Sequence, residues 1–430
     1  MSLLVISPDF ASHYGPLAVV AAAASDAGHR VVVATGPNLR RRVEADGFDW
    51  RMLRLGAGAN TGIATCDPSI ERFIAATAAG PIATMRRQAL DREQDLLFEP
   101  ERVAVEVARL CDELEPDSVI VDHVSFASTL AMYATSRPFV TLVPGHPSQL
   151  PVGRERYGVP EIWPLRFRPD PHQLAELESL VGRVTQVFTD RWNTALDEVA
   201  PNRQPVADAF RAHGDRVLYN SISELQAPSR VTGMPSDHRF VGPLVRHEQL
   251  PAELSSWATS HDGRPQVYVA LGTFLSHRRD VLARITEALV HLGVRAAVAT
   301  GATPVERLGP LPDDWVVAPQ LAQVAMLRHA DLIVHHGGNN SVQEAFAAGV
   351  RQIVLPFSTD QFSNGADLER IGAASVLPPN ETTAVDLALA IDVGLTAVRR
   401  PASETVSVDD LVDAVFGRTR TSETPSHPTR

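Results

Sequence analysis

One stretch of the chain combines glycines, polar side chains and a helical pattern in an order that suits anion binding. An apolar run beginning at Leu332 predicts a buried strand, and Gly337 and Gly338 allow a tight turn after it. The residues that follow have helical periodicity, with Asn340 or Ser341 as the expected N-cap. The free N–H groups and the positive end of this helix would face a bound anion, for which a diphosphate is the obvious candidate.

Two more polar residues flank this turn. His336 lies on its rim, and Glu344 lies one helical turn beyond Ser341. A carboxylate would therefore stand close to the phosphate site, within reach of neutral hydroxyls such as those of a ribose. An ordinary strand-turn-helix of a parallel sheet can carry the same glycines, so the turn alone leaves a purely structural role open.

A second group of candidate residues lies near the start of the chain. Residues 3–7 predict a strand, residues 17–27 a helix and residues 29–35 another strand, which together make a βαβ unit. Functional residues of parallel sheets gather at the carboxyl ends of the strands. His13 follows the first strand and Asp122 ends a later one, so both side chains are expected at the same edge of the sheet.

Residues that could contact a second substrate are less sharply marked. His146 lies in a Gly- and Pro-rich loop at another carboxyl end. Phe73 and Met85 belong to a loosely patterned segment, residues 56–100, that could cover a hydrophobic ligand. The alternative is that these two residues are core residues of added helices. Further along, residues 174–200 predict a pair of helices.

Composition excludes several classes of protein. The chain has 430 residues, of which 44% are hydrophobic and 21% charged, so it can bury the cores of two or more domains. The formal net charge of −12 argues against nucleic acid as a partner, because phosphate backbones need a basic face. The two cysteines, Cys66 and Cys111, have no metal or redox spacing. No apolar run reaches the roughly 18–20 residues of a membrane span, and we expect a cytoplasmic protein.

The α/β rhythm begins twice along the chain. We therefore expect two Rossmann-like domains that face each other across a cleft, in a monomer or a homodimer. The expected boundaries are residues 1–228 for the first domain, 229–262 for a linker, 263–400 for the second domain, 401–417 for a C-terminal helix and 418–430 for a disordered tail.

The spacing of the anion-binding stretch resembles a known signature. His336-x-Gly338-x-Asn340-Ser341-x-x-Glu344 is followed by an apolar strand and then by Asp360-Gln361-x-x-Asn364. This order is similar to the donor signature of the UDP-glycosyltransferase-like family of bacterial natural-product glycosyltransferases, which have the GT-B fold. The segment from His13 to Pro16 is similar to the His-x-x-Pro of that family's first loop.

The resemblance implies a role for each matching residue. His13 would be the catalytic base, oriented by Asp122. The donor would be held by diphosphate ligands, a ribose ligand, sugar ligands and a turn that binds the base. In chain order these donor-binding residues are Thr273, Ala318, Gln320, His336, Gly338, Asn339, Asn340, Ser341, Glu344, Asp360 and Gln361. Val317 stands where plant members have an aromatic residue, which leaves a UDP- or a dTDP-sugar as the donor.

The implied reaction is inverting transfer of a hexose from a nucleotide-diphosphate sugar to a hydroxyl or amine of a small, apolar natural product. Antibiotic biosynthesis and other secondary metabolism use such reactions. The chain has no Asp-x-Asp motif, so neither a metal nor a further cofactor is expected. The Asp-Gln pair favours a hexose that keeps its hydroxyls. Two alternatives remain: a nucleotide-sugar epimerase or hydrolase, which would need no His13 base, and a non-catalytic helper protein, which should lack the His–Asp pair.

Overall fold

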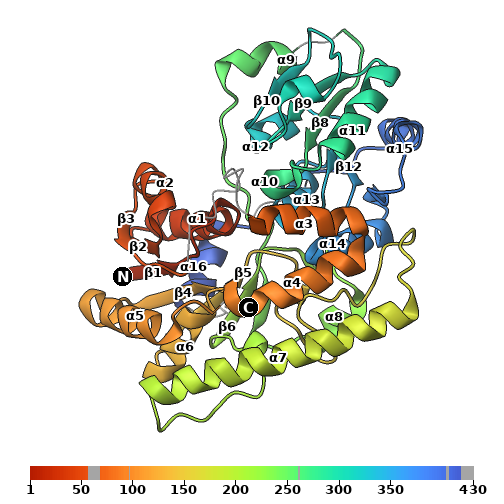
Figure 1. Ribbon diagram of the computed structural model, residues 1–430. Coiled ribbons are helices and arrows are strands. Elements are labelled where there is room, and N and C mark those ends of the chain that lie inside the picture. Colours follow the sequence, from red (N-terminus) through yellow and green to blue (C-terminus); the bar gives the residue numbers. More distant parts are fainter. Residues whose placement is uncertain (57–67, 96, 260–261, 403–405, 418–430) are drawn as a thin grey trace, which may run out of the picture.

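The computed structural model describes residues 1–56, 68–95, 97–259, 262–402 and 406–417 (Figure 1). Cys66 and the expected disordered tail lie outside these ranges. The described residues form two α/β domains, each built on a parallel sheet, as the sequence predicts. The strand order is β3-β2-β1-β4-β5-β6-β7 in the first sheet and β10-β9-β8-β11-β12-β13 in the second.

The first sheet is buried on both faces, which explains why its strands are nearly continuous apolar runs. Leu4 and Ile6 of the central strand face one apolar core, while Leu3 and Val5 face the other. The seven strands are β1 (Ser2–Ile6), β2 (Arg30–Thr35), β3 (Asp49–Met52), β4 (Ser118–Asp122), β5 (Val140–Val143), β6 (Arg216–Tyr219) and β7 (His238–Phe240).

Helices cover both faces of this sheet. The α-helices of the first half are α1 (Ala11–Asp26), α2 (Arg40–Ala45), α3 (Pro68–Ala79), α4 (Pro81–Asp95), α5 (Pro100–Leu114), α6 (Phe126–Thr135), α7 (Pro171–Val199), α8 (Pro228–Gly233) and α9 (Ser255–Thr259). Short 3₁₀ helices are η1 (Pro37–Leu39), η2 (Pro147–Gln149), η3 (Ala209–Arg211), η4 (Ser223–Leu225) and η5 (Ala252–Leu254).

The second domain repeats this layered arrangement. Its strands are β8 (Gln266–Ala270), β9 (Arg295–Ala299), β10 (Val316–Ala318), β11 (Leu332–His335), β12 (Arg351–Val354) and β13 (Ala374–Val376). Its helices are α10 (Gly272–Leu275), α11 (Arg279–Leu292), η6 (Val305–Arg307), α12 (Gln323–Leu327), α13 (Asn339–Ala347), α14 (Thr359–Arg370) and α15 (Ala384–Thr396). Side chains of β8 again alternate between two cores, with Val267 facing one and Tyr268 the other.

Three details differ from the sequence-based expectations. The predicted pair of helices at residues 174–200 is the single helix α7, which Asp170 caps and whose apolar side chains lie along one face. Strand β7 lies within the predicted linker and extends the first sheet beyond residue 228. The helix after the glycine turn begins two or three residues earlier than predicted, because its N-cap is Gly338 rather than Asn340 or Ser341.

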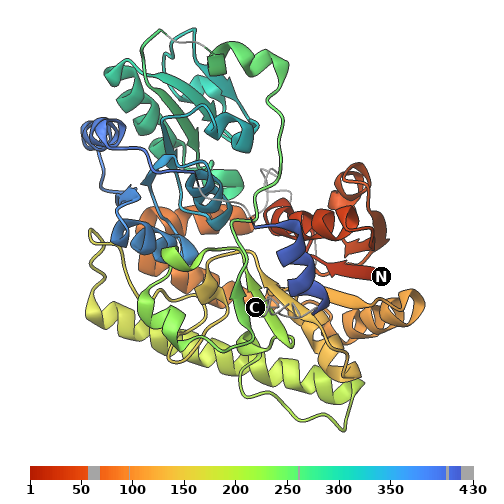
Figure 2. The same ribbon diagram turned by 180° about the vertical axis from the view of Figure 1, so that it is seen from behind.

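The two domains are in direct contact. Met85 of α4 and Leu177 of α7 share an apolar cluster with Phe346 of α13 and Phe362 of α14. The chain also returns to the first domain at its end, where α16 (Val408–Phe416) packs against α1 (Figure 2). Among the described residues, no helix is both long and apolar enough to span a membrane.

Candidate active site

His13 and Asp122 form a buried pair at the carboxyl edge of the first sheet. The Nδ1 atom of His13 lies 3.0 Å from Oδ2 of Asp122. The carboxylate is fully buried, and its Oδ1 atom accepts a hydrogen bond from the Val124 N–H at 2.9 Å. The His13 side chain keeps 21% of its surface exposed, so the ring remains open on one side while the carboxylate fixes its orientation.

The charge balance at His13 favours the protonated ring. Burial alone would lower its pKa, but the charge and the hydrogen bond of Asp122, helped by the charge of Asp360, raise it above the ordinary 6.5. Asp360 belongs to the second domain, so both domains act on this one imidazole. An imidazole that gains a proton easily is suited to act as a general base.

The helix that carries His13 begins earlier than the sequence indicates, and its sixth residue is a proline. Helix α1 starts at Ala11, so His13 lies in its first turn rather than in a loop. Pro16 has no N–H, so the Ser12 carbonyl lacks its usual helical donor four residues on. Instead, Nδ2 of Asn340 donates a hydrogen bond to this carbonyl at 2.7 Å. The proline thus leaves an acceptor through which the glycine turn of the second domain holds the His13 turn of the first.

The two adjacent histidines of the glycine turn face different surroundings. His335 ends β11 and is fully buried, with Nδ1 accepting a hydrogen bond from the Gly337 N–H and Nε2 lying 2.9 Å from Oε1 of Gln352. His336 is partly exposed, and its ring lies where a Cβ atom would stand on Gly272 or Gly338. Burial lowers the pKa of His336 to about 4, so its ring is neutral at pH 7 and can donate one N–H.

Helix α13 presents its N-terminus at this turn. The amides of its first three residues have no acceptor within the helix, since the first helical bond runs from Val342 N to Gly338 O. Gly337 has a φ of 87°, and a Cβ atom there would also lie 2.8 Å from Val354, so glycine is required. These amides, the helix dipole and the neutral His336 ring can together stabilise a diphosphate.

The other polar residues of α13 have several partners. Asn339 donates hydrogen bonds to the carbonyls of Pro144 and Asn220 in the first domain, so its side chain joins the domains and is not available to a donor. Ser341 accepts from Gln323 at 3.1 Å, and Gln323 also donates to Glu344 at 2.5 Å. Burial raises the pKa of Glu344 to about 7, with the charge of Glu248 acting in the same direction.

Glu344 lines a cavity of about 840 Å³ between the two domains. Ala18 and Val19 of α1 form one wall of this cavity, and residues 243–247 of the connecting segment form another. On the second-domain side the cavity is lined by Glu344, Ala347 and Ala348 of α13, so the Glu344 carboxylate faces an open space between the domains.

The predicted sugar ligands Asp360 and Gln361 differ in their contacts and exposure. Gln361 accepts hydrogen bonds from the Phe357 and Ser358 N–H groups and forms a capping box at the start of α14. Its side-chain oxygen therefore caps a helix, and the binding of a sugar hydroxyl by Gln361 stays a prediction. Asp360 is partly exposed and lies 3.5 Å from Nε2 of Gln149.

The remaining donor residues lie at the same edge of the second sheet. Ala318 ends β10, and its carbonyl accepts a hydrogen bond from the Thr300 N–H. Gln320 follows in an exposed turn. The side chain of Thr273 lies outside the described part of the chain, although its backbone belongs to α10.

The three residues predicted to contact an acceptor lie in contacts between the two domains. Met85 is 1% exposed within the interdomain apolar cluster, and Phe73 packs against the core of the second domain. His146 is buried, and its Nε2 atom lies 3.0 Å from Asp367 of α14. Helix packing occupies Met85 and an interdomain hydrogen bond occupies His146, and their contact with an acceptor stays a prediction.

Comparisons with known proteins agree with this fold. Residues 283–412 match the model of the family described as erythromycin biosynthesis protein CIII-like, C-terminal domain. The fold is similar to that of glycosyltransferase VinC in complex with dTDP, with a TM-score of 0.64 and 19% identity over 92% of this chain and 91% of that one. SnogD from Streptomyces nogalater has a TM-score of 0.59 at 20% identity, and 92% of each chain is covered.

The solved structures show a GT-B fold for this chain, and its C-terminal part is similar to the erythromycin biosynthesis protein CIII-like family.

Curated relatives have higher sequence identity to the chain, but over shorter stretches of it. A PGL/p-HBAD biosynthesis glycosyltransferase of Mycobacterium tuberculosis is 26% identical over 285 residues, which are 66% of this chain and 64% of the relative. A demethyllactenocin mycarosyltransferase of Streptomyces fradiae is 28% identical over 201 residues, 46% of this chain and 42% of the relative. The match therefore spans less than two thirds of the length of each of these relatives.

Sequence reasoning missed several functional contacts of this GT-B protein. It did not anticipate that Asn339 and Asn340 would join the domains, or that Pro16 would leave an acceptor for Asn340. The Pro16 effect could have been foreseen, since a proline shortly after a helix start always frees one carbonyl. The influence of Asp360 on His13 could not, because it depends on how the two domains meet.

Proposed function

We propose that this chain is an inverting glycosyltransferase that moves a hexose from a UDP- or dTDP-sugar to a hydroxyl or amine of a small, apolar natural product. The observation that carries the proposal is the buried His13–Asp122 pair, located across a direct interdomain contact from a glycine turn that suits a diphosphate. A helper protein that only binds the donor has no need of such a base, and neither does a hydrolase or epimerase that works without an acceptor.

In the proposed reaction, the acceptor hydroxyl attacks the anomeric carbon while Nε2 of His13 takes its proton. Nδ1–H of His13 donates to Asp122, which stabilises the imidazolium as it forms. The bond between the anomeric carbon and the diphosphate oxygen breaks, and the electron pair leaves with the diphosphate. Attack opposite the leaving group inverts the anomeric centre, so an α-linked donor yields a β-glycoside.

The leaving diphosphate gains charge in this step. Amide groups at the start of α13 and the neutral ring of His336 are already in place to stabilise that charge. This arrangement supports a reaction in which protein dipoles hold the diphosphate and no metal or further cofactor takes part. Residues around the 840 Å³ cavity, including Glu344, would hold the ribose.

The expectation that the transferred hexose keeps all its hydroxyls is weakened by the structure. It depends on two adjacent sugar ligands, and the oxygen of Gln361 caps α14 instead. Asp360 remains as a ligand for a sugar hydroxyl or for a charged amino group. We therefore retain a hexose as the transferred group. The number of hydroxyls on this sugar is to be determined by testing several UDP- and dTDP-sugars as donors.

The test is product formation from UDP- and dTDP-sugars with a panel of small, apolar acceptors, followed by mass spectrometry. The wild type should give a product heavier by one sugar, with inverted anomeric configuration by NMR. His13→Ala should lower turnover about 10²-fold or more, whereas His172→Ala, at an exposed position of α7, should not. Retained anomeric configuration, or full activity of His13→Ala, would refute the proposed chemistry.

A further inference from the structure

Three potential metal ligands gather at the edge of the first sheet that is opposite to the proposed active site. His213 lies shortly before β6, and Asp237 and His238 lie at the start of β7. Because the strands are parallel, these positions are at the amino edge of the sheet, whereas Asp122 ends β4 at the carboxyl edge. The cluster is therefore separate from the proposed chemistry.

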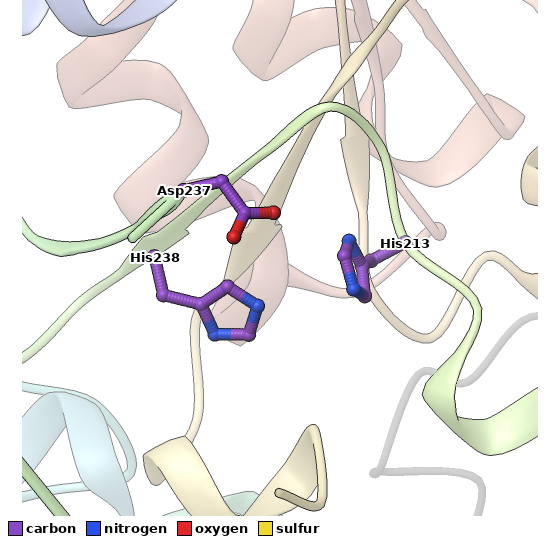
Figure 3. A group of neighbouring side chains, drawn as sticks. All are labelled: His213, Asp237 and His238. Carbon is purple, nitrogen blue, oxygen red and sulfur yellow. The ribbon is translucent and has the colours of Figure 1, made fainter. Parts of the chain in front are cut away.

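The ligand atoms of the three side chains lie close together. One nitrogen from each histidine and one carboxylate oxygen are all within 4.8 Å of one another. Figure 3 shows the Asp237 carboxylate and the two rings facing a common space. Tetrahedral ligands with bonds of about 2.0–2.2 Å lie roughly 3.3 Å apart, so small side-chain rotations would bring these atoms to coordination distance.

Hydrogen bonds to the other ring nitrogens leave the facing nitrogens available. Nδ1 of His213 lies 2.7 Å from the Gly214 carbonyl, which can only accept, so Nδ1 carries the proton and Nε2 keeps its lone pair. Nδ1 of His238 lies 2.8 Å from the hydroxyl of Tyr219. Metal-binding histidines are commonly oriented by such a bond from the second nitrogen.

His238 supplies the observation that points most directly to a ligand. Its side chain is 8% exposed, and its Nε2 atom is buried without a hydrogen-bond partner among the described residues. A buried polar atom left in this way usually has a ligand, an ion or a water. In Figure 3 the ring edge that carries this atom is turned towards His213.

The surrounding charges also permit a cation. The positive charge of Arg230 acts on His238, and its guanidinium lies 6.0 Å from the centre of the Tyr219 ring. Arg230 is ion-paired with the buried Glu155, so its charge is offset locally. Asp237 contributes a further negative charge at the cluster itself.

We propose that His213, Asp237 and His238 bind a divalent transition metal, for which Zn²⁺ is the best match, with water in the fourth position. Two imidazoles and one carboxylate are a ligand set that Zn²⁺ accepts in proteins. The role would be structural, because β7 is a three-residue edge strand and the metal would link its start to the segment before β6. This region is also where the chain leaves the first domain for the second.

The experiment measures metal binding without reference to activity. The full chain is dialysed against EDTA, exchanged into chelator-free buffer and titrated with Zn²⁺, and the bound metal is counted by mass spectrometry after gel filtration. We expect one Zn²⁺ per chain and a higher Tm in its presence. Co²⁺ substitution should give visible absorption bands typical of a site with low coordination number.

Matched variants assign the ligands. His213→Gln, Asp237→Asn and His238→Gln should each weaken Zn²⁺ binding more than about tenfold, whereas His291→Gln, at an exposed position in the last turn of α11, should not. His213 and Asp237 are partly exposed, so their variants decide the outcome if the buried His238 variant fails to fold. The proposal is overturned if EDTA-treated wild type binds no Zn²⁺, or if binding is the same in the folded variants as in the wild type.

Discussion

At the scale of single residues, the proposed chemistry depends on how Asp122 acts on His13. Burial works against a charged imidazole, and only the carboxylate partner turns the balance, so that the pKa of His13 is raised rather than lowered. The same carboxylate is fixed by the Val124 N–H and has no freedom to turn away. The pair therefore sets both the orientation and the proton affinity of the proposed base.

The pH dependence of kcat/KM in the Asp122→Asn variant tests whether Asp122 raises the pKa of His13. A base must be neutral to act, so wild-type kcat/KM should fall as the pH drops through a pKa above the ordinary 6.5. Without the Asp122 charge, burial dominates, and the acidic limb of the profile should move to lower pH while the maximal rate decreases. Profiles measured from about pH 5 to about pH 9 give both quantities. Asp360→Asn, which removes a smaller contribution, should produce a smaller shift, and an unmoved limb in Asp122→Asn would contradict the assignment.

Glu344 offers a second residue-scale prediction, concerning stability. Its pKa is about 7 in the folded chain against an ordinary 4.5, so the fold favours the protonated carboxyl and loses stability as the pH rises between these values. Glu344→Gln cannot ionise, so its Tm should exceed that of the wild type at pH 8 and match it near the ordinary pKa. One pKa unit corresponds to about 1.4 kcal/mol, so the gain is on the order of 3 kcal/mol.

Thermal unfolding at several pH values measures this difference. Glu253→Gln, at an exposed position, is the control and should show no such pH-dependent gain. A Glu344→Gln variant that is less stable than the wild type at alkaline pH would mean that the ionised carboxylate stabilises the fold. Donor affinity should nevertheless fall in Glu344→Gln, because an amide is a weaker acceptor for ribose hydroxyls than a carboxylate.

At the scale of elements, the β11–α13 turn depends on residues that have no side chain. Gly338 has an ordinary backbone conformation, so its backbone alone would tolerate alanine. A Cβ atom at this position would, however, collide with the ring of His336. The glycine therefore leaves the space in which the histidine of the proposed diphosphate site stands.

Gly338→Ala should accordingly displace His336 and weaken nucleotide binding. We expect the Kd for UDP or dTDP, measured by calorimetry, to rise about tenfold or more, which corresponds to about 1.4 kcal/mol. Gly233→Ala is the matched control, since a Cβ atom there meets nothing within 4 Å. Equal affinities for the two variants would show that the His336 ring does not contribute to nucleotide binding.

The same turn shows how far sequence reasoning reaches. The strand, the glycines and the helix of this turn were predictable from periodicity, as was the position of His13 and Asp122 at one sheet edge. The helix start was not, because Asn339 and Asn340 use their side chains between domains rather than as caps. The capping role of Gln361 was also not predicted, since its side-chain oxygen accepts hydrogen bonds at the start of its own helix. Local pattern cannot show whether a polar side chain has a near or a distant partner.

At the scale of the whole molecule, the two domains are held together at several places. Asn340 reaches Ser12, His146 reaches Asp367, and an apolar cluster that includes Met85 and Phe346 lies between the domains. The residues predicted to contact an acceptor belong to these contacts, because a sequence shows that a side chain is apolar but not which domain covers it. Contacts between domains were thus the feature that the sequence did not predict for Met85 and His146.

In the proposed reaction the two domains have different roles: the second domain holds the diphosphate, and the first removes the proton of the acceptor. This assignment of roles is tested most directly by measuring the Kd for UDP or dTDP and the turnover number in His13→Ala and His336→Ala. We expect His13→Ala to lose turnover by about 10²-fold or more with nearly unchanged nucleotide affinity, and His336→Ala to lose nucleotide affinity. The account would be contradicted if His13→Ala lost nucleotide affinity in proportion to its turnover, or if His336→Ala bound nucleotide as the wild type does.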